Sequence, residues 1–329
     1  MPSALNAKRK QFYGIAEWYG KLFCALGDLE RKELVGQKLG ALPCPYLHQV
    51  PTLGPQSGKL SCNKSGGVCS LRNFHDPSDH EDLSFGDITA TCPNRFLEHG
   101  TIVSHIGKVV LNTNKPLFAK EIAFLRRPKS RLASQSVEEI EVEQIGEQLE
   151  LAVTDVGRED VGRIDLVFVE PDAPENWCAV EMQAVYFSGG AMSKDMDAIK
   201  TYTGNGIPMP GAARRPDFRS SGPKRLMPQL MIKVPTLRRW GKKMVVVIDR
   251  PFLDAMDDME RVSDISNCDI VWVVVAFEQA PGDTEATLAI HDTIFTTLED
   301  AVKGLTAGEP TTLSEFEAKI GARAKPTFG

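Results

Sequence analysis

Apolar residues recur along the chain with two different periods, and each period predicts one type of element. Apolar side chains at helical spacing predict an amphipathic helix over residues 12–26. A capping-box signal, Ser136 with Glu139, begins a second helical pattern that continues to Leu149. Further helices are expected over residues 253–261, 293–304 and 312–322, the last with Thr312 and Glu315 at capping-box spacing.

Apolar and β-branched runs predict the strands of a central sheet. The runs Ile164–Val169 and Trp177–Val185 flank a turn-rich stretch, which predicts an antiparallel hairpin. Two later runs, 244–248 and 270–277, are almost wholly apolar and suit strands that are buried on both faces. Another strand is expected to start at 151–154. Together these elements predict an α/β fold, with a mixed central sheet flanked by helices.

The composition is ordinary for a soluble globular protein, with 42% hydrophobic and 25% charged residues, and excludes a disordered, collagen-like or coiled-coil chain. Its 329 residues are enough for about two domains, and a change of composition near 112–116 suggests 1–115 and 116–329 as their limits. No stretch approaches the roughly 18 apolar residues of a membrane-spanning helix. The basic start at Lys8–Lys10 is not followed by an apolar secretory core, so we expect a cytoplasmic protein without a membrane partner.

Charged residues are unevenly distributed around the net charge of −6. Residues 121–185 carry 6 basic and 15 acidic side chains, whereas residues 186–250 carry 13 basic and 4 acidic ones. An acidic block beside a basic block suits an enzyme that binds a metal ion with carboxylates and holds a polyanion next to it. Chance clustering on solvated loops gives the same pattern, so charge alone leaves both interpretations open.

The seven cysteines are concentrated in one segment, since four of them fall between positions 44 and 92. The odd total argues against a disulfide framework. The segment is rich in Pro, Gly, Ser and Asn and poor in long apolar runs. We therefore expect a small loop-rich module that a metal ion holds together in place of a hydrophobic core of its own.

The ligands of such a metal ion remain open at this point. Four thiolates, from Cys44, Cys62, Cys69 and Cys92, would give a closed structural site for zinc or iron. The competing ligands are His48, His75 and His80, and unliganded thiols are a third alternative. The gaps between the four cysteines hold 17, 6 and 22 residues, without a Cys-x-x-Cys pair, so the spacing is not that of a standard zinc finger.

Carboxylates interrupt both strands of the predicted hairpin. Asp165 lies inside the first strand, and Glu181 and Gln183 lie on one face of the second because they are two positions apart. Charged residues in apolar strands are costly unless they are paired or bind a metal ion. Mg²⁺ prefers one or two carboxylates with water and phosphate oxygens, so the hairpin is a candidate magnesium site. Carboxylates that simply face solvent are the alternative.

The hairpin and the cysteine segment occur together in one known family. Asp165, followed after fifteen residues by Glu181-Met182-Gln183, resembles the PD-(D/E)XK nuclease motif with glutamine in place of the usual lysine. With the cysteines before it, the chain resembles the NotI family of type II restriction endonucleases. The segments that carry the resemblance are, in order, Ile15–Gly20, Cys44–Leu47, Ser61–Lys64, Gly67–Cys69, Cys92–Arg95, Glu150–Thr154, Val180–Gln183 and Val271–Val275.

The resemblance implies a fold and a role for each matching residue. The fold would be a PD-(D/E)XK restriction-endonuclease-like core, preceded by a small loop-rich four-cysteine module. Cys44, Cys62, Cys69 and Cys92 would hold one structural iron, with zinc as the alternative. Asp165 and Glu181 would bind the catalytic Mg²⁺, and Gln183 would orient the attacking water, whether or not that water is bound to the metal. Glu150 matches a further acidic residue of the family and would contact a second ion.

The resemblance also implies an activity and partners. The chain would be a Mg²⁺-dependent homodimer that cleaves double-stranded DNA at a G/C-rich palindrome and leaves 5′-phosphate and 3′-hydroxyl ends. A DNA methyltransferase would act on the same site. The alternatives are a less specific defence or repair nuclease of the same fold and a catalytically silent DNA-binding protein. The basic segment 194–243 matches the family poorly, so the recognition sequence itself is not implied.

Arginine and lysine residues in and before the basic segment are the candidates for DNA contact, because Arg is the usual reader of guanine. The candidates are Arg95, Lys108, Lys194, Arg214, Arg215, Arg219, Lys224 and Arg225, together with Arg238 and Arg239. The sequence does not separate those that would touch bases from those that would touch phosphates.

Overall fold

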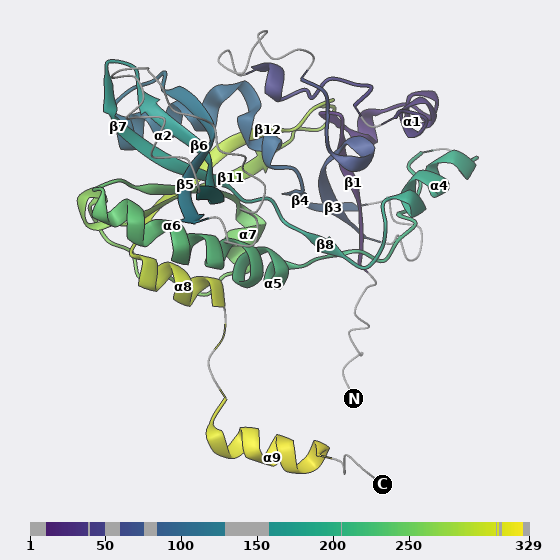
Figure 1. Cartoon of the computed structure of the whole chain (residues 1–329). Coiled ribbons are helices and arrows are strands. Elements are labelled where there is room, and N and C mark those ends of the chain that lie inside the picture. Colours follow the sequence, from purple (N-terminus) through teal and green to yellow (C-terminus); the bar gives the residue numbers. More distant parts are fainter. Residues whose placement is uncertain are drawn as a thin grey trace, which may run out of the picture.

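The computed structural model describes residues 11–38, 40–49, 60–75, 84–128, 158–204, 206–306, 308 and 311–324. A six-stranded mixed sheet with the strand order β12-β11-β10-β7-β6-β5 forms its centre (Figure 1). Strand β10 runs parallel to β7 and β11, and the outer pairs are antiparallel. The strands are β5 Leu117–Pro128, β6 Arg158–Glu170, β7 Ala173–Met182, β10 Met244–Asp249, β11 Ile270–Glu278 and β12 Thr287–Thr296. The predicted hairpin and mixed sheet are confirmed.

Helices cover both faces of this sheet because its central strands are apolar on both sides. Val245 and Val247 of β10 pack into one core with helix α2 (Thr101–Leu111). Val246, between them, points to the other face and packs with α6 and α8. The remaining helices are α1 Asp28–Val35, α4 Ser193–Thr201, α5 Phe218–Ser221, α6 Met227–Arg239, α7 Arg250–Asp254, α8 Leu298–Thr306 and α9 Leu313–Arg323. The fold is therefore a sheet between two layers of helices, as the apolar runs predict.

A second sheet, with the order β2-β1-β3-β4, lies in the N-terminal part of the chain. Its strands are β1 Gln11–Trp18, β2 Lys21–Leu22, β3 Val68–His75 and β4 Ser84–Ala90. The predicted helix over residues 12–26 is therefore wrong. Strand β1 pairs with β2 on one side and β3 on the other, and it is buried from Gly14 to Trp18. Burial on both faces removes the alternation that would have indicated a strand.

Apolar residues of the cysteine segment pack into cores that they share with other parts of the chain. Trp18, Phe23, Leu71 and Phe74 belong to a buried cluster between this sheet and α4. Buried residues of the cysteine segment also join the core under the central sheet, where Tyr46 and Cys69 share one cluster with Val180. Hydrophobic burial therefore runs continuously from the N-terminal part into the central sheet. The domain limit at residue 115 stays a prediction.

The predicted C-terminal helices are shifted in two cases. Helix α7 begins earlier than predicted and ends at Asp254, because Asp249 caps it and Pro251 occupies its first turn. Residues 293–296 belong to β12, since pairing with β11 holds them extended, and α8 follows from Leu298. Helix α9 begins after Thr312 with the expected capping box, so that prediction is confirmed. The predicted helix over 136–149 and the strand start at 151–154 lie outside the described residues.

Irregular helical turns and a short strand pair complete the described chain. The 3-10 turns are Phe23–Ala25, Leu47–Gln49, Ser65–Gly67, η6 Pro93–Gly100 and Ile265–Asn267, and a π-turn, η8, spans Gly222–Leu226 between α5 and α6. Strands β8 (Phe187–Ser188) and β9 (Arg215–Pro216) form a separate pair. Over the described ranges, the helices are too short or too polar to cross a membrane.

A buried aspartate joins the two sheets. Asp249, at the end of β10, is fully buried and accepts hydrogen bonds from the backbone N–H of Ala90 at 2.7 Å and of Phe252 at 3.1 Å. Burial raises the pKa of Asp249 to about 7. The folded protein therefore keeps a proton on Asp249 that the unfolded chain releases near pH 4. The stabilisation of the folded state by this protonated carboxyl is present at acid pH and is lost as the pH rises through about 7.

Replacing this aspartate by asparagine is expected to reduce the pH dependence of stability. In the wild type, the free energy of unfolding should fall by about 2–3 kcal/mol between pH 5 and pH 8 because of this residue. Asp249→Asn should lose that decrease, as measured by urea unfolding at both pH values. Asp264→Asn is the matched control, because Asp264 also caps a helical turn but has an exposed side chain. An unchanged pH dependence in Asp249→Asn would contradict the expectation.

Candidate active site and cysteine cluster

Two carboxylates face each other on the hairpin of β6 and β7. Leu166 pairs with Val180 in antiparallel register, and the next position in that register places Asp165 opposite Glu181. The surroundings of the two side chains differ, since Glu181 is 3% exposed whereas Asp165 is exposed. The structure therefore brings together the two carboxylates that the sequence singles out.

A lysine from another element reaches Glu181. Lys233 of helix α6 is 6% exposed and donates from Nζ to Glu181 Oε2 at 2.8 Å and to Gln229 Oε1 at 2.9 Å. Burial raises the pKa of Glu181 to about 7, and the adjacent Asp165 carboxyl raises it too, whereas Lys233 lowers it. Glu181 is therefore partly protonated near neutral pH in the absence of a divalent cation.

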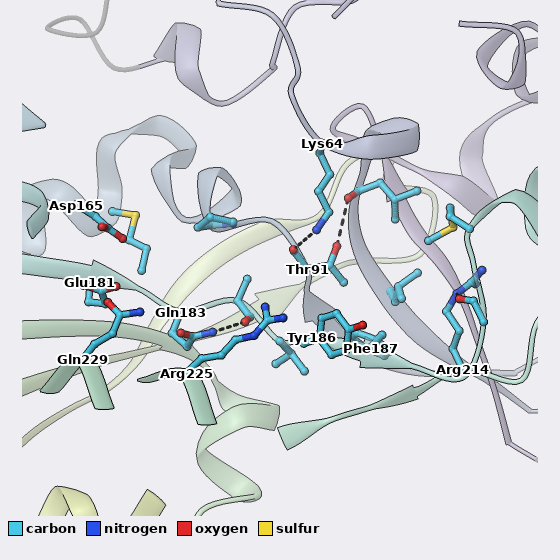
Figure 2. A pocket seen from close by; sticks show the side chains of 18 residues that line it. Lys64, Thr91, Asp165, Glu181, Gln183, Tyr186, Phe187, Arg214, Arg225 and Gln229 are labelled. Carbon is cyan, nitrogen blue, oxygen red and sulfur yellow. Dashed lines mark hydrogen bonds between the residues drawn. The ribbon is translucent and has the colours of Figure 1, made fainter. Parts of the chain in front are cut away.

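The carboxylates open into a cleft of about 710 Å³ between the hairpin and the N-terminal sheet (Figure 2). Asp165, Glu181 and Gln183 line one side of it. Lys64 and Thr91 line it too, and Lys64 Nζ donates to the backbone oxygen of Thr91 at 2.6 Å. Segments far apart in the sequence thus line one cleft, which holds both the acidic pair and a basic side chain.

An arginine also lines the same cleft. Arg225 lies on the π-turn η8, and its guanidinium carbon is 4.6 Å from the centre of the Tyr186 ring. Both side chains line the cleft and are exposed. An arginine held over an aromatic ring keeps its donors available for a phosphate. The cleft can therefore accept a polyanion next to the carboxylate pair.

Gln183 is fixed at the edge of the cleft by its own backbone and side chain. Its N–H donates to the backbone oxygen of Val247 at 2.9 Å, which extends the pairing of β7 with β10 beyond Met182. Its Nε2 donates to the backbone oxygen of Ala184 at 2.7 Å. A neutral amide can orient a partner by hydrogen bonding but cannot serve as a base.

The four cysteines of the N-terminal segment lie in one buried cluster. Cys44 and Cys62 lie on adjacent extended segments, and the N–H of Cys92 donates to the backbone oxygen of Cys69 at 3.2 Å. The four side chains are between 3% and 6% exposed, and all are free thiols. Burial raises the pKa of Cys62, Cys69 and Cys92, and neighbouring thiols add to the rise.

The cluster as placed does not form a metal-binding arrangement. In the part of the chain that the structure describes, no three His, Cys, Asp or Glu side chains are arranged so that they could hold a metal ion. Metal binding would require the thiols to draw together and to lose their protons. The side chains of the competing ligands His48, His75 and His80 lie outside the described part.

Two of the arginines predicted to contact DNA are buried, which corrects that prediction. Arg95 is fully buried, in ion pairs with Glu17 at 2.9 Å and Glu98 at 3.0 Å. Arg214 borders the cleft but is 4% exposed, and its guanidinium is bound by Asp195 and by backbone carbonyls. Neither guanidinium is free to reach DNA, because its donors are used within the protein.

The other basic candidates are exposed. They are Lys108 on α2, Lys194 on α4, Arg215 on β9, Arg219 on α5, Lys224 and Arg225 on η8, and Arg238 and Arg239 on α6. Arg225 alone among these exposed residues lines the described cleft. Arg238 forms ion pairs with Asp269 and Glu299, so it has partners within the protein.

Sequence reasoning missed Lys233 and Gln229 and could not place Glu150. Glu150 lies outside the described residues. Gln229 and Lys233 are four positions apart on α6, which puts them on one helix face. Apolar residues at 226, 230, 234 and 237 fill the adjoining face. This spacing was the available signal, but a lysine within a basic segment is usually a solvent-exposed residue.

A comparison with protein families finds a match to the model of restriction endonuclease NotI. The match covers residues 28–146 and 131–287, which is most of the chain. It includes the four clustered cysteines, the hairpin carboxylates and the helix that carries Lys233. No curated protein matches the chain.

Proposed function

Because the chain belongs to the NotI family of restriction endonucleases, and is therefore a DNA endonuclease, we propose that it cleaves both strands at a specific, G/C-rich palindrome in a Mg²⁺-dependent reaction. One observation supports the proposed site above all. Asp165 and Glu181, opposite each other on a hairpin, line a cleft that also carries Arg225 and Lys64. The products would be 5′-phosphate and 3′-hydroxyl ends.

The carboxylate pair fits a divalent cation. Two adjacent carboxyl groups, one of them buried with a pKa raised to about 7, gain from a cation that offsets their repulsion. Asp165 and Glu181 supply the number of carboxylates that Mg²⁺ usually takes in proteins. When bound, Mg²⁺ would offset the negative charge that develops on the scissile phosphoryl group.

The remaining side chains have separate roles in the proposed reaction. Gln183 lies on the same side of the cleft as the carboxylates and would orient the water that attacks the phosphorus in line. Because its amide accepts no proton as a base does, the proton of the water passes to solvent or to a phosphate oxygen. Arg225, stacked on Tyr186, would bind a backbone phosphate next to the scissile one.

A homodimer is the assembly that we propose for this reaction. A palindrome has two-fold symmetry, and a two-fold dimer would present one cleft to each strand. The exposed Lys108, Lys194, Arg215, Arg219 and Lys224 are the further candidates for DNA contact. A methyltransferase that acts on the same palindrome would protect the host DNA from cleavage.

We also propose that Cys44, Cys62, Cys69 and Cys92 bind one structural iron or zinc ion. The support is that four free, buried thiols lie in one cluster, where burial and the charge of neighbouring thiols disfavour several thiolates without a cation. Binding would draw the thiols together from the arrangement described above. The ion would stabilise the N-terminal wall of the cleft and would take no part in cleavage.

Replacing one of these cysteines is expected to remove the metal and destabilise the protein. Cys62→Ser should carry less than about one fifth of the wild-type metal and melt at least about 5 °C lower, since a structural metal site contributes folding free energy. Elemental analysis and thermal unfolding measure the two effects. Cys268→Ser, a buried cysteine outside the cluster, is the control and should keep its metal. A wild-type preparation without iron or zinc would rule out the metal site.

Digestion of a large, fully sequenced DNA tests the proposed function. The purified protein is incubated with unmethylated DNA in Mg²⁺ and in EDTA, and every end is mapped. Discrete fragments whose ends share one palindrome would support site-specific cleavage and reveal the site. A smear would favour a less specific nuclease, and intact DNA in both Mg²⁺ and Mn²⁺ would contradict cleavage by this hairpin.

A further inference from the structure

Helix α6 presents polar side chains to the carboxylate hairpin. Gln229 lies in the cleft, and Lys233 follows it one helical turn later. Arg225, on the π-turn before the helix, lines the same cleft. Leu230 and Val234 on the adjoining face are buried against the central sheet, so the rotation of the helix is fixed. The packing of α6 therefore determines where the Lys233 ammonium lies.

The ammonium of Lys233 forms its hydrogen bonds within the candidate active site. Lys233 is 6% exposed, and a buried ammonium is costly unless its donors are used. Its two hydrogen bonds go to Glu181 Oε2 at 2.8 Å and to Gln229 Oε1 at 2.9 Å, and both acceptors belong to residues that line the cleft. Gln229 holds the ammonium from its own helix and leaves it aimed at one oxygen of Glu181.

We propose that Lys233 is a positioning residue for the cleavage reaction: it holds Glu181 through Oε2, so that the carboxylate offers its other oxygen alone to a divalent cation shared with Asp165. This inference rests on the function proposed above. A carboxylate held through one oxygen binds a cation in one geometry, whereas a free carboxylate can also bind through both oxygens. The same positive charge repels the cation, so Lys233 fixes the cation's position and lowers its affinity.

Loss of the ammonium should therefore strengthen cation binding while it slows cleavage. In Lys233→Met, the affinity for Ca²⁺ without DNA should rise about tenfold, because a positive charge beside the ligand is gone. The single-turnover cleavage rate at saturating Mg²⁺ should fall about 100-fold, because a displacement of about 1 Å at the reacting centre has an effect of that size. Calorimetric Ca²⁺ titration and rapid-quench cleavage measure the two effects.

The matched control lies away from the cleft. Arg261→Met removes another ion-paired cation, one whose partner Asp292 lies outside the cleft. It should change neither the Ca²⁺ affinity nor the cleavage rate. If Lys233→Met does not fold, Lys233→Gln, which keeps a neutral donor, is expected to change both quantities in the same directions.

The outcomes separate this inference from the proposed function. An unchanged Ca²⁺ affinity, or tighter Ca²⁺ binding with a wild-type cleavage rate, would overturn the positioning role and reduce Lys233 to a counter-ion. Tighter binding with slow cleavage would support it. Failure of the proposed function looks different, because a wild-type protein that does not cleave, or a Glu181→Ala variant that cleaves normally, rejects the hairpin site whatever Lys233 does.

Discussion

Glu181→Ala is expected to abolish Mg²⁺-dependent DNA cleavage, with a loss of about 10³-fold or more in the single-turnover rate. Glu181 is the buried member of the carboxylate pair, and its removal leaves Asp165 as the lone carboxylate of the hairpin site. The variant also leaves the ammonium of Lys233 without its ion-pair partner. The cleavage rate is measured with saturating Mg²⁺ and with the protein in excess over DNA.

DNA binding should survive the same change. In the proposed site, binding would be carried by cations along the cleft such as Arg225 and Lys64, and removal of a carboxylate would lessen the repulsion of phosphate. The dissociation constant in Ca²⁺, measured by fluorescence anisotropy, should therefore stay within about threefold of the wild type. Glu170→Ala is the control. Glu170 is the last residue of β6, and its carboxylate accepts a hydrogen bond from Asn176 at 2.7 Å. Retained turnover in Glu181→Ala would reject the site assignment.

Arg95→Met is expected to lower the free energy of unfolding by about 3–5 kcal/mol. Arg95 is fully buried between Glu17 and Glu98, and its guanidinium also donates to the backbone oxygen of Ala286 at 2.8 Å. Its removal leaves both carboxylates buried without a positive charge. Because these partners come from β1, η6 and the segment before β12, the loss acts on the junction between the two sheets.

Urea unfolding of three variants tests this expectation. Arg163→Met is the control, because Arg163 pairs with Glu121 on the surface, where an ion pair contributes about 0–1 kcal/mol. Adding Glu17→Gln to Arg95→Met removes one of the orphaned charges and should recover part of the lost stability. A loss in Arg95→Met no larger than in Arg163→Met would show that the buried ion pairs contribute little.

Much of the central sheet is predictable because its central strands are almost wholly apolar. Strands β10 and β11 are runs of valine and isoleucine, and such runs are apolar on both faces whatever surrounds them. The hairpin is predictable as well, since a short turn between β6 and β7 leaves only an antiparallel pairing. Strand β1 is not predictable in this way, because Phe12, Ile15, Ala16 and Tyr19 also fit a helical period and only pairing with β2 and β3 decides between them.

The sequence predicts the local part of the candidate site but not its long-range contacts. Asp165 and Glu181 are brought together by local register, which the sequence contains. Lys233 lies 52 positions from Glu181, and its contact depends on how α6 packs on the sheet. Arg95 is predicted to contact DNA because its charge indicates a surface residue. It is buried because it pairs with Glu17, which lies 78 positions away in the chain. Long-range packing decides whether a charge faces DNA or the protein interior.

The continuous core between the N-terminal part and the central sheet restricts how such endonucleases can be recombined. Tyr46 and Cys69 share a buried cluster with Val180, and Ala90 bonds Asp249 across the junction. A chimera joined at residue 115 would therefore replace the side chains on one side of this shared core. The new side chains would leave voids and unpaired polar groups at the junction. Exchange between family members should therefore be tolerated at single cleft-facing side chains such as Lys64 and Arg225, and should fail with whole modules.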